Sequence, residues 1–100
     1  MIDCIKKIAM QIVEELMDSQ KYIDLASKMK EDYPRLADLY RDLSAEELAH
    51  AERLHEAGTD LVKADDEEDA ESAKIIWEWE TERMERWEQS IKVLHEMYAK

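Results

Sequence analysis

The spacing of apolar residues limits this chain to long helices. Apolar side chains recur every three to four residues along most of the sequence, which is the period of one face of an α-helix. No long stretch alternates between apolar and polar residues as a half-buried β-strand does. The chain also has only one glycine and one proline, so it contains little turn chemistry. These features predict an all-α fold.

Two interruptions divide the chain into three predicted helices. Pro34 suits a first helical turn but disfavours a helical conformation at Tyr33, so one helix ends and another begins there. The acidic run over residues 64–69 indicates a second loop that leads into the last helix. The three predicted helices occupy about residues 3–30, 34–62 and 69–98, within a single domain over residues 1–100.

Gly58 is the residue that could end the second helix early. Leu61 and Val62 keep the apolar phase beyond it, so we expect the helix to continue. The short loop before Pro34 makes the first two helices an antiparallel hairpin, beside which the third long helix packs. Each helix would be about 40 Å long. Three such rods form a thin bundle, for which self-association is the expected remedy.

The net charge of −12 narrows the choice of partners. Nucleic acids and anionic membranes attract lysine and arginine, so neither is an expected partner, and the field instead favours cations. The single cysteine, Cys4, cannot form an intramolecular disulfide. No stretch is apolar enough to span a membrane, and the N-terminus lacks the order of a secretory signal. The expected location is the cytoplasm.

Two residues that can bind a metal lie on the apolar stripe of the second helix. Glu47 and His50 are three residues apart, so they lie one helical turn apart on the same face. The stripe consists of Leu36, Tyr40, Leu43, Glu47, His50, Leu54, Ala57 and Leu61. Burying a carboxylate and an imidazole there unpaired would be costly, and a shared metal ion would remove that cost.

The first helix offers a further carboxylate, Glu15, in the middle of its own apolar stripe. Glu15 lies further before Pro34 along the chain than Glu47 lies after it. The resulting offset is about one and a half turns, which an asymmetric turn or a helix tilt could absorb. Two carboxylates and one imidazole suit Fe²⁺, Mn²⁺ or Zn²⁺. The non-metal interpretation places both glutamates at the edge of the stripe and His50 in an interface.

These residues resemble the ferritin-like superfamily, above all its rubrerythrin-like members and the half-length encapsulated ferritins. In those families a glutamate of the first helix is followed two turns later by an aromatic residue, and a Glu-x-x-His-Ala motif stands in the second helix. Here Tyr22 follows Glu15 at that spacing, and Glu47 begins the motif in the second helix. The likeness covers somewhat more than the first half of the chain, through the first two predicted helices.

The resemblance implies that Glu15, Glu47 and His50 are metal ligands that carry the catalysis, with Tyr22 close to the site. A four-helix di-iron site takes one glutamate from each of two helices and a Glu-x-x-His from each of the other two. One chain supplies half of that set. The resemblance therefore implies a homodimer or higher homo-oligomer, in which dimerisation completes a four-helix bundle around iron, with manganese or zinc as alternatives.

Some features of the family pattern are missing. The third helix has no second Glu-x-x-His, because Lys92 stands three residues before His95. The cysteines of a rubredoxin-type electron-transfer domain are also absent. The sequence shows no C-terminal encapsulin-targeting tail, although the resemblance leaves an encapsulin-type shell open as a partner.

Other residues are weaker candidates for metal ligands. Glu52 and His55 form a second Glu-x-x-His, which indicates either a surface pair or an accessory metal site. Glu80 interrupts the apolar stripe of the third helix, where it could join the site or pair with a basic residue. Three tryptophans are expected to be packing and interface anchors: Trp77, Trp79 and Trp87.

The predicted function is that of a di-iron protein that binds Fe²⁺ and oxidises it with O₂ or peroxide, as a ferroxidase does. Two other classes stay open. One is a non-catalytic, acidic helical interaction module with a tryptophan-lined docking face. The other is a metal storage or sensing dimer without redox turnover. Metal binding and oxygen consumption distinguish the three.

Overall fold

The computed structural model describes residues 1–64 and 70–100, and within these ranges it contains helices and no strands. The helices are α1 (Ile2–Met29), α2 (Pro34–Ala64) and α3 (Ala70–Ala99). The prediction of an all-helical chain is therefore confirmed. The loop predicted from the acidic run falls mostly on residues 65–69, which lie outside the described residues.

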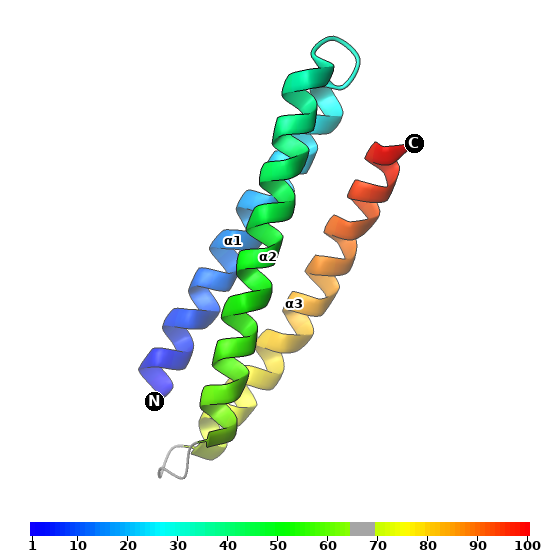
Figure 1. Cartoon of the computed structure of the whole chain (residues 1–100). Coiled ribbons are helices and arrows are strands. Elements are labelled where there is room, and N and C mark those ends of the chain that lie inside the picture. Colours follow the sequence, from blue (N-terminus) through cyan, green and yellow to red (C-terminus); the bar gives the residue numbers. More distant parts are fainter. Residues whose placement is uncertain (65–69) are drawn as a thin grey trace.

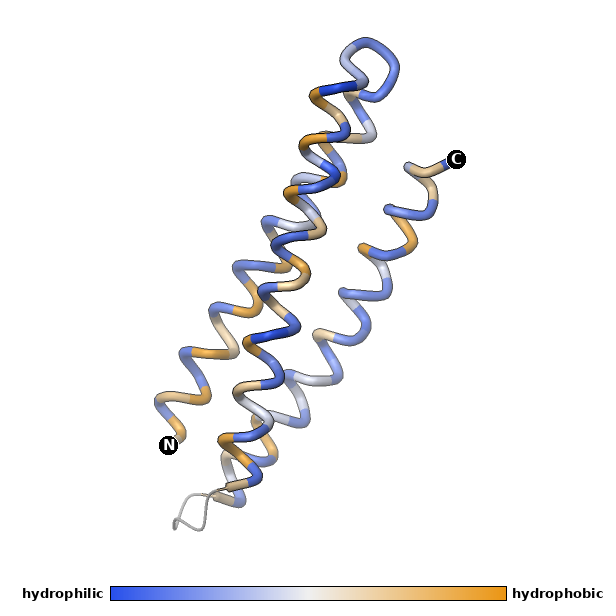
Figure 2. Tube along the Cα trace, in the orientation of Figure 1, coloured by the Kyte–Doolittle hydropathy of each residue, from blue (hydrophilic) through white to orange (hydrophobic). Residues whose placement is uncertain are grey.

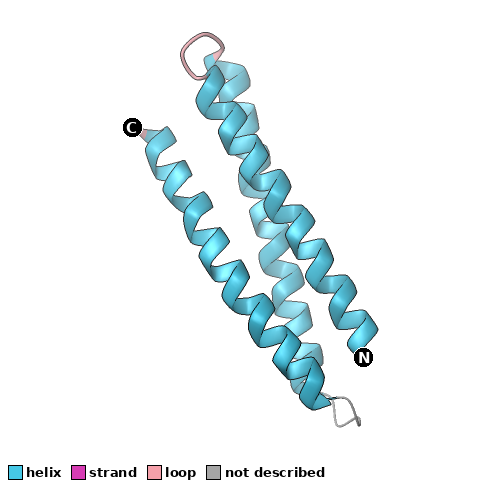
Figure 3. Cartoon of the chain, turned by 180° about the vertical axis from the view of Figure 1, so that it is seen from behind, coloured by secondary structure: helices cyan, strands magenta, loops and turns pink. Residues whose placement is uncertain are grey.

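The three helices form a slender bundle of 56 × 17 × 15 Å. Figure 1 shows α1 and α2 as an antiparallel hairpin, with α3 running in the same direction as α1. The view from behind in Figure 3 shows that the C-terminus lies near the turn between α1 and α2, and the N-terminus lies at the opposite end. The described part of one chain thus contributes three helices, one fewer than a four-helix bundle.

The turn between α1 and α2 is held by backbone hydrogen bonds around Pro34. The Tyr33 amide donates to the Met29 carbonyl at 2.8 Å, which closes the end of α1. The Ala37 amide donates to the Tyr33 carbonyl at 2.9 Å and starts α2. Pro34 takes the first position of α2, where its missing amide hydrogen costs nothing.

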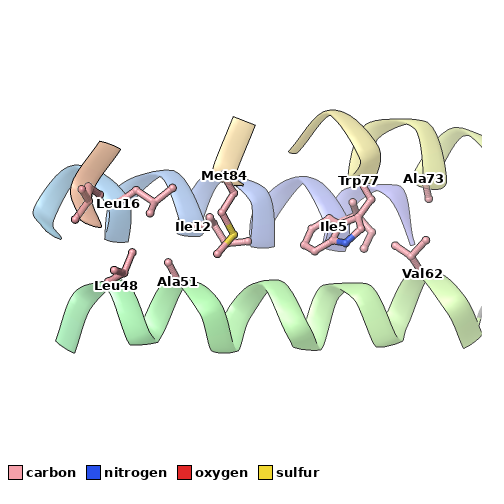
Figure 4. Close-up of a cluster of buried hydrophobic side chains, with 10 residues drawn as sticks. Ile5, Ile12, Leu16, Leu48, Ala51, Val62, Ala73, Trp77 and Met84 are labelled. Carbon is pink, nitrogen blue, oxygen red and sulfur yellow. The ribbon is translucent and has the colours of Figure 1, made fainter. Parts of the chain in front are cut away.

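The core follows from the three-to-four spacing of apolar residues, but in α2 the prediction was wrong about the face: the predicted stripe is exposed or half-buried, and the neighbouring face with Leu48, Ala51 and Val62 is buried. Figure 2 shows apolar and polar residues following one another around each helix, so each helix has an apolar side to bury. The main cluster joins all three helices, as the close-up in Figure 4 shows. Its buried members are Ile5, Ile12, Leu16, Leu48, Ala51, Val62, Ala73, Trp77, Met84 and Ile91.

A second, smaller cluster attaches the C-terminal end of α3 to the hairpin. Tyr98 is buried there against Ile23, Ala26 and Ala37. Its hydroxyl donates to Asp38 Oδ1 at 2.6 Å, so the polar end of the ring is satisfied. The Lys30 ammonium also bonds to the Tyr98 carbonyl at the end of α3. These contacts keep α3 aligned with the hairpin along its length.

Two small serines let α1 and α2 approach closely between the two clusters. Ser19 Oγ donates to the Ser44 carbonyl at 2.8 Å, and Ser44 Oγ donates to the Ser19 carbonyl at 2.6 Å. Both side chains are fully buried. This reciprocal pair fixes the register of the hairpin one turn away from Glu15 and Glu47.

None of the helices in the described ranges combines the length and the apolar character needed to cross a membrane.

Candidate metal centre

Glu15 of α1 meets Glu47 and His50 of α2 in the middle of the hairpin. One ligand atom from each of the three side chains can be chosen so that all lie within 4.8 Å of one another. His50 Nδ1 is 3.4 Å from Glu15 Oε2 and 3.6 Å from Glu47 Oε1. Among the described residues, no other cluster of histidine, cysteine and carboxylate side chains has this compactness.

The position of the turn explains why the two helices place these residues at one height. Counting from Pro34 makes Glu15 and Glu47 appear offset, because Pro34 is the first residue of α2 and not the centre of the turn. Residue 31 lies midway between the two glutamates, inside the turn that follows α1. The hairpin is therefore symmetric about residue 31, and no helix tilt is needed to bring the carboxylates together.

Glu15 carries a buried oxygen, Oε2, that has no hydrogen-bond donor while both glutamates are ionised. Its side chain is 19% exposed, and its Oε2 atom accepts no hydrogen bond although His50 Nδ1 lies 3.4 Å away. An unpaired buried carboxylate oxygen costs free energy. A divalent cation between Glu15, Glu47 and His50 would satisfy this oxygen, so the donor set fits a metal ion.

The pKa of Glu47 is raised because its carboxyl group lies next to that of Glu15. A hydrogen bond with the Glu15 carboxyl raises the pKa of Glu47 to about 7, with further contributions from burial and from the charge of Glu15. Paired carboxyl groups behave in this way because both cannot ionise cheaply at short distance. A cation would remove the repulsion that keeps the proton on Glu47.

The site opens to the surface on the side of His50. The side chain of His50 is 50% exposed. A surface cavity of about 390 Å³ adjoins Glu15 and His50. Its other lining residues are Gln11, Arg53, Leu54 and Ala57. Glu15 and Glu47 thus form the inner wall of the site, and His50 forms its rim.

Tyr22, expected near the site, stacks on a second tyrosine. The rings of Tyr22 and Tyr40 lie 5.9 Å apart between centroids at an interplanar angle of 25°. Tyr22 comes seven residues after Glu15 and Tyr40 seven residues before Glu47, so the pair lies two turns from the metal-capable group along the hairpin. Sequence reasoning missed Tyr40 as the partner of Tyr22, although its mirrored spacing was a usable signal.

The remaining residues considered from the sequence lie elsewhere. The Glu52 side chain is exposed. His55 stacks on Trp77, with ring centroids 5.2 Å apart, and its Nε2 is 2.8 Å from Thr81 Oγ1. Glu80 is buried in α3 and pairs with Arg83. None of the three belongs to the group formed by Glu15, Glu47 and His50.

Comparison with known proteins gives a family match. The profile of the Rubrerythrin family matches residues 6–100, which is nearly the whole chain and includes α3. No curated protein matches the chain, and no solved structure matches it either. The all-helical fold, the paired glutamates with their histidine and the extent of the family match lead to one conclusion: the chain belongs to the Rubrerythrin family.

Proposed function

We propose that this protein binds iron through Glu15, Glu47 and His50 and oxidises Fe²⁺ at a site that a homodimer completes. The observation that carries the proposal is the unsatisfied buried oxygen of Glu15, which lies within a compact group of two carboxylates and one imidazole. Carboxylate and imidazole ligands suit Fe²⁺, and membership of the Rubrerythrin family supports iron over manganese or zinc.

The need for a second copy follows from the number of ligands. A di-iron site in a four-helix bundle uses about six protein ligands, and one chain brings three together. Two chains related by a two-fold axis at the open, His50 side would supply the full set. Two hairpins facing each other would also form the four-helix bundle that one chain lacks.

Apolar residues on α2 support this face as the dimer interface. Leu36, Leu39 and Leu61 are 40%, 52% and 38% exposed. Their spacing places them on the same side of α2 as His50, above and below the metal-capable group. Exposed leucines in one line cost solvation free energy in a monomer, and a second copy would cover them.

The side chains of this chain have separate tasks in the proposed reaction. Glu15 would offer its Oε2 to the ion, and Glu47 would give up its proton when the cation binds. His50 offers Nδ1, the ring nitrogen that faces both carboxylates. Bound Fe²⁺ would supply the electrons: two Fe²⁺ ions would become two Fe³⁺ ions and reduce one O₂ to hydrogen peroxide, with two protons taken up from water. The half-exposed rim at His50 leaves a path for the oxidant.

The test is to load the protein anaerobically with Fe²⁺ and then admit air. We expect oxygen consumption and an absorbance change in the wild type, both lost in Glu47→Ala and His50→Ala. Glu56→Ala is the matched control, because Glu56 is an exposed glutamate on another face of α2. Metal bound without oxygen consumption would favour a storage or sensing dimer. Absence of any bound divalent metal would favour an interaction module.

The dimer is tested separately by Leu39→Glu. This change places a charge in the exposed leucine line without touching the three ligands. We expect the variant to lose dimer mass in sedimentation. It should also bind iron more weakly, because the second copy would supply half of the ligands. Full iron oxidation by a monomeric Leu39→Glu protein would show that a single chain is sufficient.

A further inference from the structure

A second exposed apolar surface lies on the other side of α1, between α1 and α3. Two adjoining cavities of about 640 and 540 Å³ run along it, and both are lined by Ala9, Ile76 and Arg83. Trp79 is 77% exposed, Met10 66% and Ile75 53%, and all three line these cavities. We call this surface the α1/α3 groove. It contains none of the metal-capable residues Glu15, Glu47 and His50.

The α1/α3 groove is made by a small residue opposite large ones. Ala9 is the α1 residue that lines both cavities, and its short side chain leaves the space between the two helices open. On the core side of the same two helices, Ile5 of α1 packs close to Trp77 of α3, as Figure 4 shows. The packed core therefore lies directly behind the groove.

The charge of the groove differs from that of the rest of the chain. Its charged lining residues are Lys6, Arg83, Arg86, Glu14, Glu80 and Glu82. These are three cations and three anions, whereas the whole chain carries a net charge of −12. A chain so acidic repels its own copies over most of its surface. The α1/α3 groove is apolar and charge-balanced, so two copies can meet there without that repulsion.

We propose that the α1/α3 groove is a self-association surface that takes a second copy of this chain, with Trp79 as its anchor. Tryptophan and arginine are the residues that most often dominate interface energetics. A two-fold axis between Trp79 and Arg83 sets the indole of each copy over the guanidinium of the other, where the ring face attracts the cation. Glu82 and Arg86, which form a 3.7 Å ion pair, then flank the contact.

The groove gives the assembly a second interface, distinct from the proposed dimer at His50. Two different two-fold contacts on one chain link dimers into larger closed assemblies. If the dimer at His50 does not form, the groove alone gives a simple dimer. The self-association through Trp79 is therefore testable whether or not the proposed iron site holds.

The experiment compares sedimentation velocity of the wild type, Trp79→Glu and Gln89→Glu over a range of concentrations, with chelator and with anaerobic Fe²⁺. Gln89 is an exposed α3 residue outside both cavities, so Gln89→Glu adds the same charge away from the groove. We expect Trp79→Glu to weaken one association step by at least about tenfold. Gln89→Glu should match the wild type, and iron bound per chain should be equal in all three.

Fluorescence gives an independent measurement on the intact fold. Trp77 is buried and Trp87 half-buried, so the exposed Trp79 dominates any change in tryptophan exposure. Emission of the wild type should shift to the blue as concentration rises, and Trp79→Phe should associate without that shift.

Equal association constants for the wild type and Trp79→Glu would overturn the proposal, as would loss of every association step in Leu39→Glu alone. Loss of iron in Leu39→Glu, with Trp79→Glu unaffected, bears only on the iron site.

Discussion

The ring of Trp77 occupies the space that a side chain at position 58 would need. A Cβ atom built on Gly58 would overlap the six-membered part of the indole, whose Cζ3 atom lies only 2.9 Å away. Trp77 Nε1 also donates to Thr59 Oγ1 at 2.9 Å, so the ring is held in place. Gly58 therefore sits inside α2 as a docking position for α3, and the helix runs on to Ala64.

Gly58→Ala should destabilise the protein although alanine is the better helix former. The substitution gains about 1 kcal/mol of helix propensity. Overpacking against Trp77 costs about 1–3 kcal/mol, so we expect a net loss measured by urea unfolding. In the double variant with Trp77→Leu the clash disappears, and Gly58→Ala should then stabilise. Equal effects of Gly58→Ala in both backgrounds would contradict this account.

The helices could be predicted from the sequence because their signals are local. A three-to-four apolar period and Pro34 suffice to set α1 and α2 as a hairpin. Gly58 was a weaker signal: it resembles a helix stop, and only the position of Trp77 on the next helix shows its role. Such a contact depends on how two helices pack, which no local pattern contains.

The candidate site also combines a part that a local pattern predicts with a part that depends on helix packing. Glu47 and His50 share a face because of the helical period alone, whereas their meeting with Glu15 depends on where the turn is centred. Counting from Pro34 misplaced that centre by a few residues. The stack of Tyr22 on Tyr40 depends on the same centre. Contacts across the hairpin are thus predictable only to within a turn.

Ser44→Ala should remove a buried hydrogen-bond network that joins all three helices. The Ser44 hydroxyl gives its one proton to the Ser19 carbonyl, so it must accept from His95 Nε2, which lies 2.9 Å away. Losing this hydroxyl leaves His95 Nε2 without its acceptor and removes the second hydrogen bond to the Ser19 carbonyl, which lies inside α1. We expect a loss of about 1–3 kcal/mol in urea unfolding.

The control for this change is Ser90→Ala. Ser90 is exposed on α3 and its hydroxyl donates only to the Arg86 carbonyl one turn earlier, so its removal should be nearly neutral. The His95 ring gives a second measurement by nitrogen NMR, which should show the proton on Nε2 in the wild type. A proton found on Nδ1 would contradict the direction of the Ser44 bond.

Glu80 should be replaceable at no cost to stability. It is buried in α3, pairs with Arg83, and leaves its Oε1 without a hydrogen bond. Burial raises the pKa of Glu80, with the pairing to Arg83 acting in the opposite direction. Arg83 is 53% exposed and stays in contact with solvent when its partner is lost, so Glu80→Leu removes only the buried charge. The unfolding free energy should change by about 0–2 kcal/mol towards stability.

Arg83→Ala is the informative counterpart to Glu80→Leu. Without Arg83 the buried Glu80 carboxylate has no remaining ion-pair partner among the contacts described, so the variant should be less stable than the wild type. Both variants are best measured in the Trp79→Glu background, where association through the α1/α3 groove does not contribute. A destabilising Glu80→Leu would show that the pair is a net source of stability.

The metal-free protein should lose stability as the pH rises from about 4.5 to 7, and bound Fe²⁺ should reverse this trend. The pKa of Glu47 is raised to about 7, so the folded state holds a proton that the unfolded state releases near pH 4.5. That contribution is complete below pH 4.5 and is lost as the pH passes through 7. Solvent screening limits the change to roughly 1–2 kcal/mol. Thermal unfolding of the wild type and Glu47→Gln under chelator tests it, because the variant cannot lose this proton.

With Fe²⁺ present under anaerobic conditions, stability should instead increase with pH, since the ion displaces the Glu47 proton on binding. A metal-free wild type with the same pH profile as Glu47→Gln would contradict the shared-proton interpretation of Glu15 and Glu47.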